Sequence, residues 1–320
     1  MATTELSQQD LESILDFSVE IAGKAGALIL EGSQAIRQHL GGSTTAVDEK
    51  KNSVDLVTEY DVKVEDLVRR EISSKYPNFG FIGEESFSKG IQPELTDEPM
   101  FCVDPIDGTT NFIHGFPFSC ISIGLIYKQR PVIGIIFNPF LQQLYFALKG
   151  SGAYLNSRAT KLPLSPPGPL LSLSNALIGV EWGSDRSDSI IRLKSESFVR
   201  LGGDPKGGVT GGRMAHGMRS LGSAALNHAM VASGSMDLYW EIGCWAWDVC
   251  AGVVIAQEAG GFVSGGREAA HDGECSEKVL LGRKYIVVRA IADTPEEKGF
   301  DAQKRIVREF YDAVEDWTPV

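Results

Sequence analysis

The sequence lacks the features that mark membrane and secreted proteins. Its apolar stretch at residues 125–140 is interrupted by Lys128, Gln129, Arg130 and Pro131, and no stretch reaches the roughly 18–20 uninterrupted apolar residues that a spanning helix needs. The first ten residues are polar and acidic, unlike a signal peptide, and no N-x-[ST] acceptor occurs. We therefore expect a cytoplasmic protein with no membrane partner.

Cysteine and positive charge are also scarce. The five cysteines include no C-x-x-C pair, and Cys244 and Cys250 have no histidine pair near them, so we expect a reducing compartment and no zinc site. The chain carries 30 Lys and Arg against 42 Asp and Glu, a net charge of -12. Such an acidic chain repels the phosphate backbone of nucleic acids. Nucleic-acid binding is therefore not expected.

The 320 residues are enough for one large α/β domain or two packed lobes. Hydrophobic periodicity predicts long helices at 7–40 and 61–77, and a mostly β region follows to about residue 182, with a hairpin formed by 119–127 and 132–137. The other expected strands are 101–103, 144–148, 171–180, 238–242 and 285–290, and the other expected helices are 187–199, 224–232, 247–259 and 295–317. This alternation is typical of a layered α/β (α+β) fold. We expect a single domain, 1–320, with lobes of about 1–186 and 187–320.

Residues 202–217 contain seven glycines. A phosphate-binding loop is the alternative to consider, but neither G-x-x-x-x-G-K-[ST] nor a G-x-G-x-x-G after a strand is present. A flexible surface insertion is the favoured interpretation, and a lid over a ligand is the other.

The most informative run is 104–112, with the sequence DPIDGTTNF, which directly follows a short apolar strand. Pro105 fixes its own φ angle, so the turn can direct the carboxylates of Asp104 and Asp107 toward one point. Clustered oxygen ligands suit Mg²⁺ or Mn²⁺ better than zinc. Gly108 permits close approach of a ligand, and Thr109 is expected to open a helix whose N-terminus can bind phosphate.

Other acidic residues are candidates to join this pair. Glu84 and Glu85 follow an apolar pair, Asp248 begins an apolar helix, and Asp55 and Asp61 flank a short run before the second helix. Taken singly, Asp248 and Asp61 could be helix caps, and the two glutamates could be a charged turn. The pair at 104 and 107 makes a shared cation site the better interpretation.

These segments resemble the signatures of the inositol monophosphatase family, in the family's order. They are 83–86 (GEES), 104–112, 247–252 (WDVCAG) and 258–261 (EAGG), with 54–58 and 222–227 also similar. The resemblance covers about residues 11–290. It implies a five-layer αβαβα sandwich, a homodimer, two to three Mg²⁺ per subunit with Mn²⁺ as a possible substitute, and inhibition by Li⁺.

The resemblance also implies a role for individual residues. One Mg²⁺ would be held by Glu84, Asp104 and the carbonyl of Ile106, and a second by Asp104, Asp107 and Asp248. The catalytic residues would be Glu84, Thr109 and Asp61, the last two orienting the attacking water, with Lys50 near the metals. The substrate would contact Glu84, Ile106, Asp107, Gly108, Thr109, Gly222, Ser223, Ala224, Glu241 and Asp248.

The expected reaction is hydrolysis of a phosphate monoester, most simply myo-inositol 1-phosphate to myo-inositol and phosphate. We expect in-line attack by a metal-bound water, because metal ions neutralise the phosphoryl oxygens and stabilise the leaving alkoxide. Glu241 favours a neutral polyhydroxylated leaving group, and no basic cluster is visible in the C-terminal segments that resemble the family.

The alternative activities share this metal-dependent hydrolysis and differ in the substrate. They are phosphatases for 3'-phosphoadenosine 5'-phosphate, fructose 1,6-bisphosphate or another sugar phosphate. Family members often carry a histidine where this chain has Trp245, so the leaving-group wall differs. A catalytically idle regulatory protein on the same fold is a further alternative, which the intact acidic set argues against.

Overall fold

The computed structural model describes residues 5–39, 47–49 and 56–319. The helices are α1 (Gln8–His39), α2 (Glu59–Lys75), α3 (Glu84–Ser88), α4 (Thr109–His114), α5 (Asp188–Gly202), α6 (Ala224–Ser233), α7 (Ala246–Glu258), α8 (Glu277–Leu280) and α9 (Gly299–Tyr311). The strands are β1 (Val47–Glu49), β2 (Leu56–Thr58), β3 (Gly80–Gly83), β4 (Met100–Asp107), β5 (Cys120–Tyr127), β6 (Arg130–Asn138), β7 (Gln143–Leu148), β8 (Gly152–Leu155), β9 (Ser157–Lys161), β10 (Leu177–Val180), β11 (Gly217–Arg219), β12 (Leu238–Ile242), β13 (Phe262–Ser264) and β14 (Lys284–Val288).

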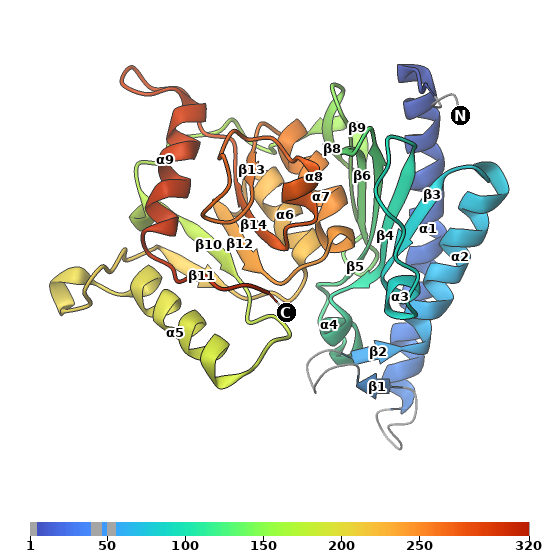
Figure 1. Cartoon of the computed structure of the whole chain (residues 1–320), viewed down its shortest axis with the longest axis horizontal. Coiled ribbons are helices and arrows are strands. Elements are labelled where there is room, and N and C mark those ends of the chain that lie inside the picture. The colour runs from blue at the N-terminus through green and yellow to red at the C-terminus, as the bar shows by residue number, and fades with distance from the viewer. Residues whose placement is uncertain (1–4, 40–46, 50–55, 320) are drawn as a thin grey trace.

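These elements form five layers (Figure 1). Helices α1 and α2 cover the outer face of a sheet with the order β3-β4-β5-β6-β7-β8-β9, and α6 and α7 cover its inner face. A second sheet, with the order β11-β10-β12-β14-β13, lies beyond α6 and α7. Its outer face is covered by α5 and α9. The predicted five-layer αβαβα sandwich is therefore confirmed.

The central helices and strands have the composition that a two-sided burial requires. All eight residues of β5 are buried, as expected for a strand covered on both faces. Helix α7 is apolar nearly all round, because it lies between the two sheets, and ten of its residues are buried. This central layer positions the start of α7, which carries Asp248.

The sequence located most elements of this fold. The hairpin of β5 and β6 is antiparallel as predicted, and α1, α5, α6, α7 and β12 lie where expected. The predicted strand at 171–180 is wrong in its first half, since Leu173–Asn175 is a 3₁₀ helix and only β10 follows. The predicted helix at 295–317 is shorter and ends at Tyr311.

Two further observations concern the predicted organisation. Strand β10 precedes residue 186 but belongs to the five-stranded sheet, whose other strands all follow that residue. The lobe boundary near residue 186 stays a prediction. The glycine-rich segment contains a 3₁₀ helix, Pro205–Gly207, and returns to the end of α5 through a hydrogen bond from Arg213 N to Arg200 O (2.7 Å). Within the described residues, no helix combines the length and apolar character needed to cross a membrane.

Candidate active site

One pocket of about 400 Å³ gathers the predicted site residues, a volume typical of small-ligand sites. The predicted residues that line it are Glu84, Asp104, Ile106, Asp107, Gly108, Thr109, Gly222, Ser223, Ala224, Glu241 and Asp248. Asp61 is buried in the first turn of α2 and is not among the lining residues. Lys50 and Asp55 lie outside the described residues.

A β-bulge explains how both aspartates of β4 reach this pocket. In a regular strand, side chains three positions apart point to opposite faces. Here Asp104 is opposite Ser122 and Asp107 is opposite Cys120, so β4 carries one residue more than β5 in this interval. The extra residue shifts the alternation, and both carboxylates then face the pocket. Pro105 lies inside the bulge, where the missing N–H is tolerated.

Gly108 lies where two distant parts of the chain meet. Its φ angle is +89°, and a Cβ atom there would lie 2.9 Å from Phe118 O and 3.0 Å from Gly222 O. Any other residue would therefore force these backbones apart. Asn111 closes the same junction, since its Nδ2 donates to Phe118 O and to Leu221 O, both at 2.7 Å.

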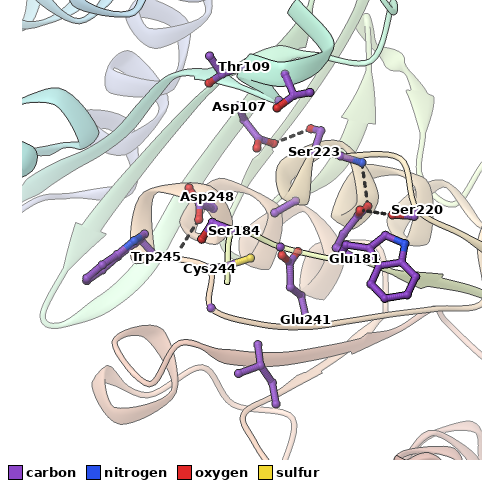
Figure 2. Close-up of a pocket in the computed structure, with 18 of the residues that line it drawn as sticks. Asp107, Thr109, Glu181, Ser184, Ser220, Ser223, Glu241, Cys244, Trp245 and Asp248 are labelled. Carbon is purple, nitrogen blue, oxygen red and sulfur yellow. Dashed lines mark hydrogen bonds between the residues drawn. The ribbon is translucent and has the colours of Figure 1, made fainter. Parts of the chain in front are cut away.

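Asp107 is held by the start of α6. Its Oδ2 accepts hydrogen bonds from Ser223 Oγ (2.5 Å) and from the N–H of Ala225 (2.7 Å), and Figure 2 shows the first of these. Burial raises the pKa of Asp107 to about 6, although these donors oppose the shift. These hydrogen bonds fix the orientation of the side chain.

Four neighbouring carboxylates, Glu84, Asp104, Asp107 and Asp248, repel one another. Burial raises the pKa of Asp104 well above its ordinary value, and Glu84, Asp107 and Asp248 raise it further. Burial, Asp107 and Glu84 likewise raise the pKa of Asp248. Asp248 is the third residue of α7, and the N-cap position is Trp245, whose N–H donates to Asp248 Oδ2 (2.7 Å). Asp248 therefore closes the first turn of the helix without being its N-cap, and it also lines the pocket. Such a group of buried acids favours a bound cation.

Glu84 opens the short helix α3, and a residue that the sequence analysis missed fixes this helix. The buried carboxylate of Glu65 accepts the N–H of Glu85 (2.8 Å) and of Ser86 (3.0 Å). Glu65 lies on α2, twenty residues earlier, so no local pattern in the sequence indicates this contact.

Glu181 was also missed, and it follows β10 directly. Its carboxylate accepts Ser220 Oγ (2.7 Å), Leu221 N (2.8 Å), Gly222 N (2.9 Å) and Asn227 Nδ2 (2.8 Å). It therefore shapes the loop at 220–222 that forms one wall of the pocket (Figure 2). A carboxylate at the end of an apolar strand was the signal that could have found it.

Glu241 is a further carboxylate of the pocket. In the view of Figure 2 it lies below Ser184 and Asp248, with Asp107 and Thr109 above. Burial and Glu181 raise its pKa to about 7, while the hydroxyl of Tyr239, which donates to Glu241 Oε2, opposes the shift. We call this part of the pocket the Glu241 end, and the part formed by Glu84, Asp104, Asp107 and Asp248 the acidic end.

Basic and aromatic side chains also line the pocket, although the C-terminal segments that resemble the family carry no basic cluster. Arg186, Lys194 and Arg283 are among the lining residues, but they are far apart in the sequence. The guanidinium of Arg283 lies 3.7 Å from the ring centroid of Trp245. Trp245 in turn stacks on Trp247, with centroids 5.2 Å apart. The residue that replaces the family's histidine thus forms part of an aromatic wall.

The donor set fits divalent cations by its chemistry. Four carboxylates and the carbonyl of Ile106 line one pocket, and oxygen donors of this kind suit Mg²⁺ and Mn²⁺. Among the described residues, no three His, Cys, Asp or Glu side chains already converge at metal-ligand spacing. The carboxylate oxygens are instead held by local donors such as Ser223 Oγ and the Trp245 N–H.

A layered α/β protein with a buried acidic pocket between its two sheets is a candidate metal-dependent hydrolase. A model of the inositol monophosphatase family matches residues 10–309. The chain belongs to this family, and it is therefore a phosphoric monoester hydrolase.

Individual relatives agree with this assignment. The chain is 42% identical to inositol monophosphatase 2 of Saccharomyces cerevisiae over 301 residues, which is 92% of this chain and 94% of the relative. It is 41% identical to protein qutG of Emericella nidulans over 316 residues, 96% of this chain and 94% of the relative. Among solved structures, extragenic suppressor protein suhB of Bartonella henselae is 26% identical with a TM-score of 0.71, covering 93% of this chain and 98% of that one.

Proposed function

We propose that this protein hydrolyses myo-inositol 1-phosphate to myo-inositol and phosphate in a reaction that requires Mg²⁺. The observation that carries the proposal is the pocket itself, in which an acidic end and a separate carboxylate, Glu241, face one small cavity. The similarity to yeast inositol monophosphatase 2 supports the same substrate.

At the acidic end, Glu84, Asp104, Asp107, Asp248 and the carbonyl of Ile106 would hold two to three Mg²⁺ ions, with Mn²⁺ as a substitute. When bound, Mg²⁺ would neutralise the phosphoryl oxygens, lower the pKa of water and stabilise the leaving alkoxide. The mutual repulsion of the buried acids supports this proposal, because a cation would relieve it.

The chain's own residues would place the reacting groups. Gly108 and Thr109 lie at the start of α4 and line the pocket, so their backbone N–H groups would bind the phosphate. Thr109 Oγ1 donates to Ile106 O (3.2 Å) and, with Glu84, would orient the attacking water in line with the ester bond. Asp61 does not line the pocket, so its catalytic role is proposed to act through other residues.

The Glu241 end would bind the leaving group. An ionised carboxylate accepts hydrogen bonds from hydroxyl groups, so Glu241 and the backbone of 222–224 would bind the hydroxyl groups of the inositol ring.

A homodimer is also proposed from the family resemblance.

A second candidate is a phosphate ester whose leaving group carries another anionic group. Arg186, Lys194 and Arg283 line the pocket and favour this alternative.

The test is release of phosphate from myo-inositol 1-phosphate, 3'-phosphoadenosine 5'-phosphate and fructose 1,6-bisphosphate, each with Mg²⁺ and with EDTA. We expect preference for the inositol ester and loss of all release with EDTA. A preference for either bisphosphate would favour the second candidate. Absence of release from every ester would contradict both and favour a regulatory protein.

A further inference from the structure

The chain after α9 returns to the pocket. Figure 1 shows it running from the end of α9 past α5 to the middle of the molecule. We call residues 312–319 the post-α9 segment. Two of its residues, Trp317 and Pro319, line the same pocket as the acidic end and Glu241. Residues more than sixty positions after Asp248 thus form part of the site wall.

The post-α9 segment is fixed at several points. Its Glu315 accepts Arg200 Nη2 (2.6 Å) and donates its N–H to Ser197 Oγ (2.8 Å), both on α5. Asp316 pairs with Lys284 Nζ (2.7 Å), and Val314 O accepts Arg267 Nη2 (2.6 Å). Exposed ion pairs alone contribute little, but here bonds to the backbone accompany them. The segment is therefore held on both α5 and the five-stranded sheet.

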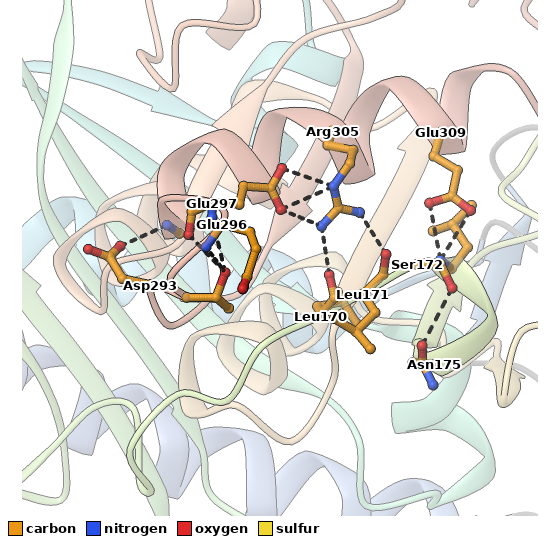
Figure 3. Close-up of polar contacts among 12 residues, drawn as sticks. Leu170, Leu171, Ser172, Asn175, Asp293, Glu296, Glu297, Arg305 and Glu309 are labelled. Carbon is orange, nitrogen blue, oxygen red and sulfur yellow. Dashed lines mark hydrogen bonds and ion pairs between the residues drawn. The ribbon is translucent and has the colours of Figure 1, made fainter.

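Helix α9, which precedes the segment, is equally well anchored (Figure 3). Arg305 pairs with Glu297 (2.8 Å) and donates to Leu170 O (3.0 Å) and Leu171 O (2.8 Å). Glu309 accepts the N–H of Leu173 at 3.3 Å. The point from which the post-α9 segment begins is thus fixed as well.

Trp317 covers a buried cation beside the Glu241 end. Its ring lies 5.6 Å from that of Trp240, centroid to centroid, and 5.5 Å from Lys194 Nζ. Lys194 is only 2% exposed, and a buried lysine needs partners. Those partners are the carbonyl of Trp182, to which Nζ donates, and the face of the Trp317 ring.

Lys194 also borders the loop that faces the substrate. A Cβ atom built on Gly183 would lie 3.2 Å from Lys194 Nζ and 3.6 Å from Glu241 Oε1. The ammonium, the carboxylate and this loop therefore meet at one point. The positive charge of Lys194 lowers the pKa of Glu241 against the effect of burial, so it favours the ionised form that accepts hydroxyl hydrogen bonds.

We propose that the post-α9 segment is part of the Glu241 end, with Trp317 as a specificity-determining residue for cyclic polyol esters. Trp317 presents an aromatic wall to the ring of the leaving group, and it holds Lys194 against the loop at 182–186. Lys194 is a positioning residue, since it acts through Glu241 and the loop. This inference rests on the proposed function.

The test measures how the full-length wild type and its variants hydrolyse two esters of different size, inositol 1-phosphate and glycerol 2-phosphate. The variants are Trp317→Ala, Trp317→Phe, Lys194→Met and the control Phe300→Ala, an aromatic residue of α9 that is not among the pocket-lining residues. For Trp317→Ala, KM for inositol 1-phosphate should rise about tenfold, the factor that corresponds to about 1.4 kcal/mol. KM for glycerol 2-phosphate and both kcat values should stay close to wild type.

The other variants separate packing from specificity. Trp317→Phe keeps a ring over Lys194 and should restore most of the affinity, and Phe300→Ala should change neither KM. Lys194→Met should raise KM for the inositol ester selectively, and the double variant should raise it by less than the product of the two factors. Circular dichroism and denaturant midpoints would confirm that each variant is folded under the assay conditions.

Two results would overturn the inference while leaving the proposed function intact. The first is an equal change of KM for both esters in Trp317→Ala, which would indicate a structural role only. The second is no change of KM for either ester in this variant. A wild-type protein that releases no phosphate from either ester would instead contradict the proposed function, and the inference would fall with it.

Discussion

The two ends of the pocket are built in different ways. At the acidic end, carboxylates are oriented by backbone and nearby side-chain donors, as when Asp107 accepts from Ser223 and Ala225. At the Glu241 end, residues from the loop after β10, from β12, from α5 and from the post-α9 segment meet, and aromatic rings and cations stand beside the carboxylates. In the proposed function, the acidic end would perform the chemistry and the Glu241 end would select the leaving group.

The largest effect is expected from Asp104→Asn, which breaks the acidic end. It keeps the shape of the side chain but removes a charge from the buried acids, and phosphate release should fall by about a thousandfold or more. The fold should persist, since Asp104 is a source of repulsion. The initial rate with Mg²⁺ checks this, and Asp188→Asn, whose side chain is 80% exposed, is the matched control. Activity within a few-fold of wild type would contradict the assignment.

A smaller loss is expected from Glu181→Gln, which loosens the wall between the two ends. The amide cannot accept all four hydrogen bonds that converge on this carboxylate. The free energy of unfolding should fall by about 2 kcal/mol, and kcat/KM for the inositol ester by about thirtyfold. Urea unfolding and steady-state kinetics measure the two quantities. Unchanged kinetics with lowered stability would show that the 220–222 loop does not shape the site.

The Glu241 end should show its own pH dependence. Burial and Glu181 raise the pKa of Glu241 to about 7, so the residue is mostly protonated at pH 6 and mostly ionised at pH 8. KM for inositol 1-phosphate should therefore fall as the pH rises through 7, by up to about tenfold. Glu241→Gln should flatten this dependence, with glycerol 2-phosphate as the reference for titration of the phosphate. A variant that retains the full pH profile would exclude Glu241 as the titrating group.

The prediction with the smallest effect on activity concerns the stability of the central layer on which both ends rest. His228 of α6 is fully buried with its Nδ1 bonded to Ala224 O (2.8 Å), and burial lowers its pKa from 6.5 to about 4. The neutral form is favoured in the folded state, so stability is complete above pH 6.5 and is lost as the pH falls toward 4.

The corresponding variant is His228→Leu. The acid-dependent loss attributable to His228, about 3 kcal/mol by linkage, should disappear in this variant. Urea unfolding of the wild type and of His228→Leu, each at pH 7 and at pH 4.5, gives the loss of stability of each protein on acidification. The difference between the two losses is the contribution of His228, because the titration of the carboxylates is common to both proteins. Equal acid sensitivity of the two proteins would contradict the assignment.

The sequence predicted the acidic end far better than the Glu241 end, for a physical reason. Asp104, Asp107, Gly108 and Thr109 lie within one short run, so local spacing places them together. The bulge in β4 that turns both carboxylates to one side is a property of the pairing with β5, and sequence spacing alone does not specify it. The acidic run could thus be recognised before its geometry was known.

Long-range contacts explain why the sequence did not indicate the other residues of the site. Glu65 holds α3 from twenty residues away, Lys194 belongs to α5, and Trp317 arrives from the end of the described chain. Each is unremarkable in its local sequence, and each reaches the site only through packing between layers. The predicted final helix ran through 312–317, which concealed the segment that turns back to the pocket.

The most direct test of the difference between the two ends is calorimetric titration of Mn²⁺ into the wild type, Asp104→Asn and Glu241→Gln. We expect the wild type and Glu241→Gln to bind Mn²⁺ with the same stoichiometry and with affinities within about twofold, a difference under about 0.5 kcal/mol. Asp104→Asn should lose most of this binding. Equal loss in Glu241→Gln and Asp104→Asn, or no binding by the wild type, would contradict the division of the pocket into a cation-binding end and a leaving-group end.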